Sequence, residues 1–349
     1  MILSILSAYR FGDRRSTVAA CQLGGLVLRC YGMGYLIGTD EAGFGPNLGP
    51  LVISATVWQS PDGVGGEELF DRLQRVVASN RREPGVWMGD SKKLYASGKG
   101  LQHLERGLWA ALGLLDACPK TWRALWQTLS PDAIDAMASI PWYRDYDEST
   151  PIDDRTDDMP AVVETLRRGM SAAGVRLMSM RSRVVFEPEF NRVVEQNESK
   201  GAALSHETLR LIVQAVDALP SDRVSVVCDK HGGRNRYAPL LAEYFPDRFI
   251  EIHGESRKRS VYRFGPPERR IEFCFRAKAE ACLPVALASM ASKYLREAAM
   301  RALNDFWRRR VPGLQPTAGY PEDAKRFRQD VAEAKKNLPI EERDWWRVK

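Results

Sequence analysis

Two adjacent carboxylates beside a glycine- and proline-rich segment constrain this chain more than any other feature of its sequence. Asp40 and Glu41 follow the β-type residues 35–38 and precede segment 43–50, which holds three glycines and two prolines. This pattern predicts a short buried strand ending in a turn, with residues 51–58 returning as the second strand of a hairpin. Neighbouring side chains on a strand point to opposite faces, so both acids reach one site only if the chain twists or turns, which glycine permits. The segment is then either a carboxylate site for a hard cation such as Mg²⁺ or a capped turn with exposed acids.

The glycines of this segment do not fit a dinucleotide-binding loop. Their spacing departs by one residue from Gly-x-Gly-x-x-Gly, and Pro46 and Pro50 oppose the helix that such a loop begins. Two carboxylates would also repel the pyrophosphate that the loop must hold. A Rossmann-type site is therefore disfavoured.

Composition narrows the chemistry further. The formal charge of +6 suits a polyanionic partner, although a basic surface without a partner gives the same value. None of the six cysteines forms a Cys-x-x-Cys pair, so neither a disulfide framework nor a structural zinc site is indicated. The four histidines do not form the His-Glu-x-x-His pattern of zinc hydrolases. A bound metal would need oxygen ligands, and a reducing cytoplasm is the expected location.

The amino-terminal residues are expected to lie outside the fold. Segment 1–33 has short apolar runs, but charged residues interrupt them, which argues against a membrane span and against a signal peptide. We expect residues 1–33 to be a disordered extension or the product of a misassigned start. Residues 34–349 would then form one domain, since α/β domains often reach this length.

Apolar periodicity predicts the remaining elements. Helices are expected over 67–78, 100–115, 161–173, 204–219, about 280–310 and 322–336, and strands over 175–186, 224–228 and 248–253, with β-rich segments to 275. Residues 89–94 are expected to form a loop, and Pro284 is compatible with the long helix only in its first turn. Segment 118–160 lacks a sustained period and is predicted to be an insertion with a solvated acidic loop.

Six segments, in the same order along the chain, resemble the motifs of the type 2 ribonucleases H, the ribonuclease HII and HIII group. They are Gly38–Pro46, Asp90–Leu94, Val226–Asp229, Lys278–Glu280, Ala288–Glu297 and Gly319–Pro321. The chain is thereby identified as a divergent member of that family. The resemblance implies an α/β, ribonuclease H-like fold, with a mixed five-stranded sheet flanked by helices and a helical carboxyl-terminal part.

The same resemblance implies the residues of the site. Two Mg²⁺ or Mn²⁺ ions would be held by four acids: Asp40, Glu41, Asp229 and Glu280. Glu297 is the alternative for the fourth position. Two such ions can bind the scissile phosphate, activate a water and stabilise the departing oxygen. The substrate-binding residues implied by the family are Gly43, Phe44, Gly45, Ser91, Lys92, Lys93 and Tyr320. Without that context, a lysine pair is usually solvated and a single tyrosine usually packs.

The resemblance implies hydrolysis of the RNA strand in RNA/DNA hybrids, or cleavage at ribonucleotides embedded in DNA. The expected protein is a monomer that binds nucleic acid and no membrane, and the sequence indicates no protein partner. Two residues depart from the family: Phe44 replaces a basic residue, and Glu280 replaces the more usual aspartate. The alternatives are an inactive nucleic-acid-binding protein, which retention of four acids argues against, and a related nuclease with a different structured substrate.

Overall fold

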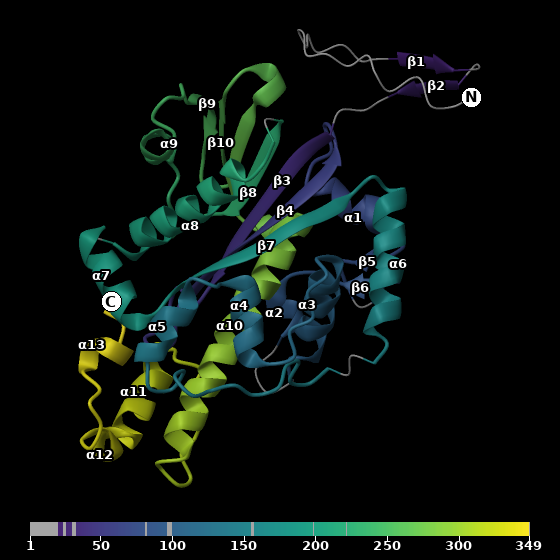
Figure 1. Ribbon diagram of the computed structural model, residues 1–349. Helices are drawn as coiled ribbons and strands as arrows, with labels where there is room; N and C mark the ends of the chain where they lie inside the picture. Colours follow the sequence, from purple (N-terminus) through teal and green to yellow (C-terminus); the bar gives the residue numbers. More distant parts are fainter. Residues whose placement is uncertain are drawn as a thin grey trace.

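The central strands are buried along almost their whole length, so they bury side chains on both faces of one sheet. The computed structural model describes residues 20–23, 26–29, 33–80, 82–95, 100–154, 157–197, 199–220 and 222–348. Seven strands form the main sheet in the order β7-β4-β3-β8-β11-β10-β9 (Figure 1). Their bounds are β3 (Met33–Ala42), β4 (Leu51–Pro61), β7 (Arg176–Val185), β8 (Val224–Asp229), β9 (Glu251–Glu255), β10 (Arg259–Phe264) and β11 (Ile271–Arg276).

The sheet is mixed. β8 is parallel to β3 and to β11, whereas every other neighbouring pair is antiparallel. The predicted α/β class, with a mixed sheet flanked by helices and a helical carboxyl-terminal part, is confirmed. The expected number of strands was wrong, because the β-rich segment before residue 275 contributes the hairpin of β9 and β10 beyond β11.

Helices cover both faces of the sheet. α10 (Leu283–Arg308) crosses β3 and β4 on one face, where Leu36 and Trp58 join its core. α8 (Lys200–Asp217) and α9 (Ala238–Tyr244) cover the other face over β3, β8, β10 and β11. Pro284 lies in the first turn of α10, as the sequence requires. None of the helices in the described part of the chain is long and apolar enough to cross a membrane.

The segment predicted to be an insertion with a solvated acidic loop also contributes helices to the main core. Residues 118–160 contain α4 (Trp122–Leu129) and α5 (Ala133–Ser139), and their tryptophans are buried in the same cluster as α10. The following acidic stretch is held by the buried Glu105 of α3 (Gln102–Leu114), which accepts hydrogen bonds from the backbone N–H groups of residues 152, 153 and 154. These helices were not predicted, because two short helices do not give a sustained apolar period. Most of the acidic side chains of the segment are exposed, as expected.

Several element bounds also differ from the predictions. The first helix ends early, as α1 (Glu68–Leu73), because β5 (Val77–Ala78) pairs with β6 (Val86–Trp87). The expected loop 89–94 contains the helical turn α2 (Ser91–Leu94), and the last predicted helix divides into α11 (Pro321–Asp330) and α12 (Ala332–Lys335). The helices α7 (Glu187–Gln196), α9 and α13 (Glu342–Trp345) were not predicted, whereas α6 (Met159–Ala172) was.

Two short strands lie within the expected amino-terminal extension. β1 (Ala20–Leu23) and β2 (Leu26–Arg29) pair as a separate antiparallel sheet. The other residues before Met33 lie outside the described part of the chain. Met33 itself begins β3.

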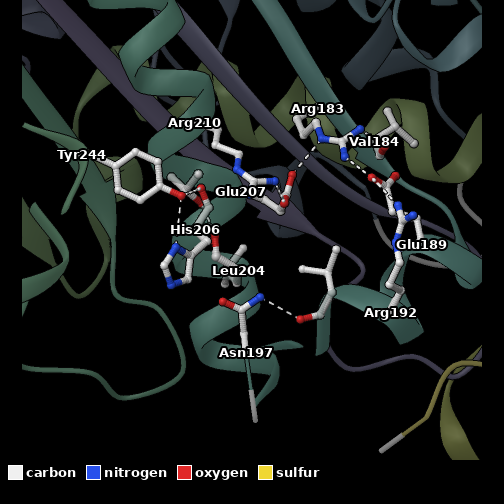
Figure 2. A network of polar contacts seen from close by, with 12 residues as sticks. Arg183, Val184, Glu189, Arg192, Asn197, Leu204, His206, Glu207, Arg210 and Tyr244 are labelled. Carbon is white, nitrogen blue, oxygen red and sulfur yellow. Dashed lines mark hydrogen bonds and ion pairs between the residues drawn. The ribbon is translucent and has the colours of Figure 1, made fainter. Parts of the chain in front are cut away.

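An ionic network ties α7 and α8 to the edge strand β7 (Figure 2). Arg183 of β7 donates to the buried Glu207 of α8 at 2.8 Å and also pairs with Glu189 of α7. The second oxygen of Glu207 accepts from Arg210 at 2.8 Å. Both Glu207 oxygens are therefore satisfied, which makes burial of this carboxylate tolerable.

α10 approaches β3 so closely that only glycine fits at residue 38. A Cβ atom on Gly38 would lie 2.3 Å from the backbone carbon of Pro284 and 2.3 Å from the nitrogen of Val285. Beside it, the Thr56 hydroxyl donates to the Pro284 carbonyl at 2.7 Å. We predict that Gly38→Ala forces α10 away from β3 and lowers the free energy of unfolding by about 1–3 kcal/mol, as overpacking of a core does. Urea unfolding would measure this. The control is Gly254→Ala, because no atom lies within 4 Å of the added carbon there. Equal midpoints for the two variants would contradict the prediction.

Candidate active site

Strand register brings two of the predicted acids together. The parallel pair β3 and β8 aligns Thr39 with Cys228, so Asp40 and Asp229 follow at the same level. Both side chains leave the sheet on the face that α10 covers, because side chains alternate and Gly38 touches α10. Adjacent strands lie about 4.8 Å apart, so these two carboxyl groups are close neighbours.

Glu41 starts from the other face of the sheet. The expected strand end at residue 38 was wrong, because β3 continues to Ala42 and pairs Asp40 with Ser54 and Glu41 with Ile53. β8 ends beside Asp40, so β3 projects beyond its neighbour at this point. Glu41 can therefore approach Asp229 only around this open end of the sheet.

Glu280 comes from the turn that precedes α10. It lies in the 3₁₀ turn η2 (Ala279–Ala281), which follows Lys278 in the left-handed conformation, with φ of 59°. The Ala279 N–H donates to the Asp229 carboxylate at 3.4 Å, which ties η2 to the end of β8. Strained backbone of this kind persists only where the surrounding structure fixes it, often at functional sites.

The four acids form one electrostatic cluster. Burial raises the pKa of Asp40 to about 7, with smaller contributions from the charges of Asp229 and Glu280 and an opposing hydrogen bond from Ser289. Burial, followed by the charges of Asp40 and Asp229, raises the pKa of Glu41 to about 8. The pKa of Asp229 is also raised, first by burial and then by Glu280. Such mutual repulsion is the situation that a bound cation relieves.

The donor set suits a hard cation, because all four groups are carboxylates. Among the residues that the structure describes, however, no group of three or more His, Cys, Asp or Glu side chains could hold a metal ion. Like charges separate when nothing neutralises them, so closure of these carboxylates around an ion requires the ion. The cluster thus fits a cation in its chemistry and would need side-chain movement to enclose one.

Glu297, the alternative fourth acid, is engaged elsewhere on α10. One of its oxygens accepts from Tyr95 at 3.0 Å, and the other pairs with Lys293 at 2.7 Å and with Arg296 at 3.5 Å. Glu280 contributes to the electrostatic environment of Asp40 and Asp229, whereas Glu297 is not among the groups that shift their pKa values.

The predicted lysine loop lies at the same site. Lys92 and Lys93 are exposed on α2, and the charge of Lys92 opposes the rise in the pKa of both Glu41 and Asp229. Ser91 is buried instead, and its hydroxyl is 2.9 Å from the Ser289 hydroxyl. Ser289 also hydrogen-bonds the Asp40 carboxyl group, so Ser91 contacts Asp40 indirectly, through Ser289.

The glycine-rich segment adjoins the acids. Gly43 has φ of 88°, and a Cβ there would lie 2.4 Å from the Pro50 carbonyl oxygen, whereas Gly45 has open space around it. Phe44 is half-buried against the cluster that contains Phe190. Tyr320 is 53% exposed, with the Arg296 guanidinium 5.8 Å from its ring centroid.

Sequence analysis missed Arg347, which clamps this segment from the carboxyl-terminal tail. Its buried guanidinium donates to the carbonyls of Gly43 at 2.5 Å, Gly49 at 3.3 Å and Phe44 at 3.4 Å. The same group lies 3.6 Å from the ring centroid of Phe190. The only sequence signal was one arginine between Trp346 and Val348, which has no recognisable motif.

A buried glutamate completes the clamp. Glu187 accepts the Gly49 N–H at 2.9 Å, and burial raises its pKa to about 7. Burial lowers the pKa of Arg347 to about 9, while the charge of Glu187 opposes that shift. The nearby Arg296 donates to the Ala318 carbonyl at 2.8 Å, just before Gly319 and Tyr320. Charges from α7, α10 and the tail thus hold the segment that follows the catalytic candidates.

No model of a known protein family matches the chain, and none of the curated proteins matches its sequence. Among solved structures, it is similar to ribonuclease HII of Archaeoglobus fulgidus in a complex with PCNA, with 14% identity, 90% of this chain and 94% of that chain covered, and a TM-score of 0.41. Ribonuclease H2 of Pyrococcus horikoshii gives 16% identity, coverages of 89% and 92%, and a TM-score of 0.41. Bst-RNase HIII in complex with Mn²⁺ is 17% identical, with 92% of this chain and 68% of that chain covered and a TM-score of 0.39. All three belong to the ribonuclease HII and HIII group that the motifs resemble, and the function is argued below from the residues of the site.

Arg347 is expected to be essential for the stability of the glycine-rich segment. Arg347→Ala would leave three carbonyl oxygens without their donor and would remove one of the positive charges near the buried Glu187. We predict a loss of about 3 kcal/mol in the free energy of unfolding, since each buried acceptor left unsatisfied costs about 1–3 kcal/mol. Arg343→Ala, in the same tail with a 78% exposed side chain, should change the stability little. Urea unfolding of both variants is the measurement, and a similar small loss in both would refute the clamp.

The acid cluster should destabilise the cation-free protein at high pH. Because folding raises the pKa of Asp40, this group favours the folded state at low pH, and that contribution is lost as the pH rises through about 7. Asp40→Asn removes the ionised form, so at pH 8 without divalent ions we expect this variant to be more stable than the parent by about 1 kcal/mol or more. The gain should shrink below pH 5. Unfolding curves at both pH values test this, with the exposed Asp247→Asn as control; a gain that does not depend on pH would contradict the assignment.

Proposed function

We propose that this chain is a metal-dependent endoribonuclease of the type 2 ribonuclease H group. It would hydrolyse the RNA strand of RNA/DNA hybrids or cut at ribonucleotides embedded in duplex DNA. The observation that carries the proposal is the cluster of Asp40, Glu41, Asp229 and Glu280, which three distant segments bring to the end of β8. Burial raises the pKa of Asp40, Glu41 and Asp229, and such groups cost stability when ionised, which is understandable at a functional site.

The proposed chemistry follows from the donor set. Two Mg²⁺ or Mn²⁺ ions, when bound by these carboxylates, would supply an activated water and neutralise the departing 3′ oxygen. Asp40 and Asp229 lie on paired strands, so the register of β3 and β8 fixes the backbone positions from which these two side chains extend. Glu41 and Glu280 flank them from the strand end and from η2. The products would carry 5′-phosphate and 3′-hydroxyl ends.

The surrounding residues suit a nucleic-acid strand. Lys92 is a flexible cation whose charge acts on Glu41 and Asp229, so a phosphate near these acids would also be near this ammonium group. The glycine-rich segment lets the backbone approach the ribose 2′-hydroxyl, which distinguishes RNA from DNA. Its shape is maintained by Arg347 through three carbonyls. The exposed Tyr320 ring is available for contact with a sugar or base.

One observation favours a second candidate, a nuclease of this group with a different structured substrate. Phe44 packs against the hydrophobic cluster around Phe190, so the segment offers no basic side chain at this position. Contacts to the substrate through the backbone of Gly43 and Gly45 would remain, whereas a contact through a cationic side chain would be absent.

A cleavage assay on four matched duplexes tests the proposal. The substrates are RNA/DNA, DNA with one embedded ribonucleotide, RNA/RNA and DNA/DNA, each with Mg²⁺ or Mn²⁺. We expect cleavage of the first, the second or both, with no cleavage of DNA/DNA. Cleavage of RNA/RNA alone would favour the second candidate. If no substrate is cut, the enzyme proposal fails.

Matched variants assign the activity to the cluster. Asp40→Asn, Asp229→Asn and Glu280→Gln should each lower kcat by more than about 100-fold, the upper range for residues behind metal ligands. Glu297→Gln should cost less than about tenfold, because Tyr95, Lys293 and Arg296 hold this side chain away from the cluster. If Glu297→Gln is the inactive variant and Glu280→Gln is active, the assignment of the fourth acid is wrong.

A further inference from the structure

The sheet face beside η2 carries a groove that the site described above does not include. α8 and α9 pack on one face of β8, β10 and β11, and the opposite face of these strands is hollowed. The groove has a volume of about 750 Å³, and its floor includes Val227 and Cys274. A second hollow adjoins it and shares Gly65, Ser225 and Glu272 with it. This concave surface runs from η2 toward the start of β8.

Basic side chains predominate around this surface. The two hollows are lined by seven basic residues, Arg223, Lys258, Arg259, Arg263, Arg270, Arg276 and Lys278, and by four acidic residues, Asp62, Glu67, Glu68 and Glu272. Three of the acids are already paired, since Asp62 binds Arg223, Glu272 binds Arg263 and Glu67 binds Arg276. Most of the acidic charge is thus neutralised within the surface.

Three of the four remaining cations line the groove itself and are free to meet an anion. Lys258, Arg259 and Lys278 are exposed, and no ion pair involves them in the part of the chain that the structure describes. Arg259 donates from Nε to the Cys274 sulfur at 3.2 Å, which orients its guanidinium along the groove. These three residues form a positive rim at the end of the groove nearest η2.

The rim is continuous with the candidate active site. Lys278 lies two residues before Glu280, and the Ala277 N–H donates to the Lys258 carbonyl at 3.0 Å. Ala279 directly follows Lys278, and its N–H donates to the Asp229 carboxylate at 3.4 Å. A polyanion that passes over Asp229 and Glu280 would therefore meet Lys278 and Lys258 next.

We propose that this groove binds the sugar-phosphate backbone of the substrate on one side of the scissile bond, through Lys258, Arg259 and Lys278. This inference rests on the proposed function and adds the path that the nucleic-acid strand takes over the protein surface. Exposed ammonium groups suit phosphate contacts that carry no sequence information, and such contacts release counterions from the nucleic acid. An acidic protein segment would match the charge equally well, but the continuity with the acid cluster favours a nucleic acid.

The chain offers a matched control at the other end of α10. Arg308 and Arg309 line a different hollow there, and α10 has 26 residues. At 1.5 Å per residue the helix spans about 39 Å, so this second basic cluster is remote from η2. Neutralising two cations near η2 or two cations at the far end of α10 changes the net charge of the protein by the same amount. The electrostatic field then changes at a different place in each variant.

The experiment measures binding of a labelled RNA/DNA hybrid by fluorescence anisotropy, in the Asp40→Asn background so that cleavage does not interfere. Lys258→Gln/Lys278→Gln is compared with Arg308→Gln/Arg309→Gln between about 50 and 200 mM salt. For the groove variant, the affinity should fall and the slope of log K against log salt should decrease by about 2, one for each lost phosphate contact. The control variant should keep the parent slope. An unchanged slope in the groove variant, or a loss confined to the control, overturns the proposal.

A second measurement locates the contact along the substrate. Because the groove lies on one side of the acids, only one flank of the duplex reaches it. Shortening that flank should abolish the difference between parent and groove variant, whereas shortening the other flank should preserve it. Equal effects from both flanks would overturn the one-sided path.

Failure of the groove proposal differs from failure of the proposed function. If the unmodified protein neither cleaves nor binds any of the four duplexes, both proposals fall. If it cleaves a hybrid and the groove variant retains the parent KM and salt slope, only the groove proposal is wrong. In the active protein, the groove variant should mainly raise KM, since the lysines contact substrate away from the reacting phosphate.

Discussion

The close contact between α10 and β3 is the constraint around which the candidate acids are arranged. At Gly38 the helix and the strand touch through backbone atoms, which leaves no space for a side chain. From this contact α10 runs beside Asp40, where Ser292 donates to its backbone carbonyl at 2.9 Å and Ser289 hydrogen-bonds its carboxyl group. The helix start fixes η2, and with it Glu280, beside Asp229. The packing of α10 on β3 thus places Glu280 beside the two aspartates, whereas the register of β3 and β8 sets the spacing between Asp40 and Asp229.

The candidate site holds several carboxylates close together, and interactions elsewhere in the fold must offset the stability that they cost. Burial, and after it the charges of the neighbouring acids, raises the pKa values of Asp40, Glu41 and Asp229, so these groups oppose folding when ionised. The adjacent glycine-rich segment is held by a buried Arg347 and Glu187, whose pKa values burial also shifts toward the neutral forms. The hydrogen bonds of Arg347 to three backbone carbonyls, and the one that Glu187 accepts from the Gly49 N–H, define one arrangement of the backbone. The network therefore gives a segment rich in glycine and proline a fixed shape, which its own sequence would not supply.

The apolar periodicity of the sequence predicted those elements whose formation depends mainly on local interactions. The strand that carries Asp229, the long helix with Pro284 in its first turn and the mixed α/β class all follow from apolar period and from proline geometry. The continuation of β3 through Asp40 and Glu41 did not follow, because pairing with β4 outweighs the weak β propensity of acidic residues. The helices of segment 118–160 were missed for a related reason. Their tryptophans are buried against α10 and against one another, which is a tertiary effect that no short window of sequence contains.

The arrangement around Arg347 also accounts for Phe44, the least expected residue in the opening motif. Phe44 packs against the cluster that contains Phe190, and the Arg347 guanidinium lies on the Phe190 ring while it binds the carbonyl of Phe44. Arg296 is a second buried cation near the same segment. A basic side chain at residue 44 would add a third positive charge beside these two, where desolvation and like-charge repulsion both oppose it. An aromatic ring extends the apolar surface on which Arg347 is stacked. Phe44 and Arg347 are therefore structurally linked, because the Arg347 cation orders the backbone of the segment while residue 44 itself carries no charge.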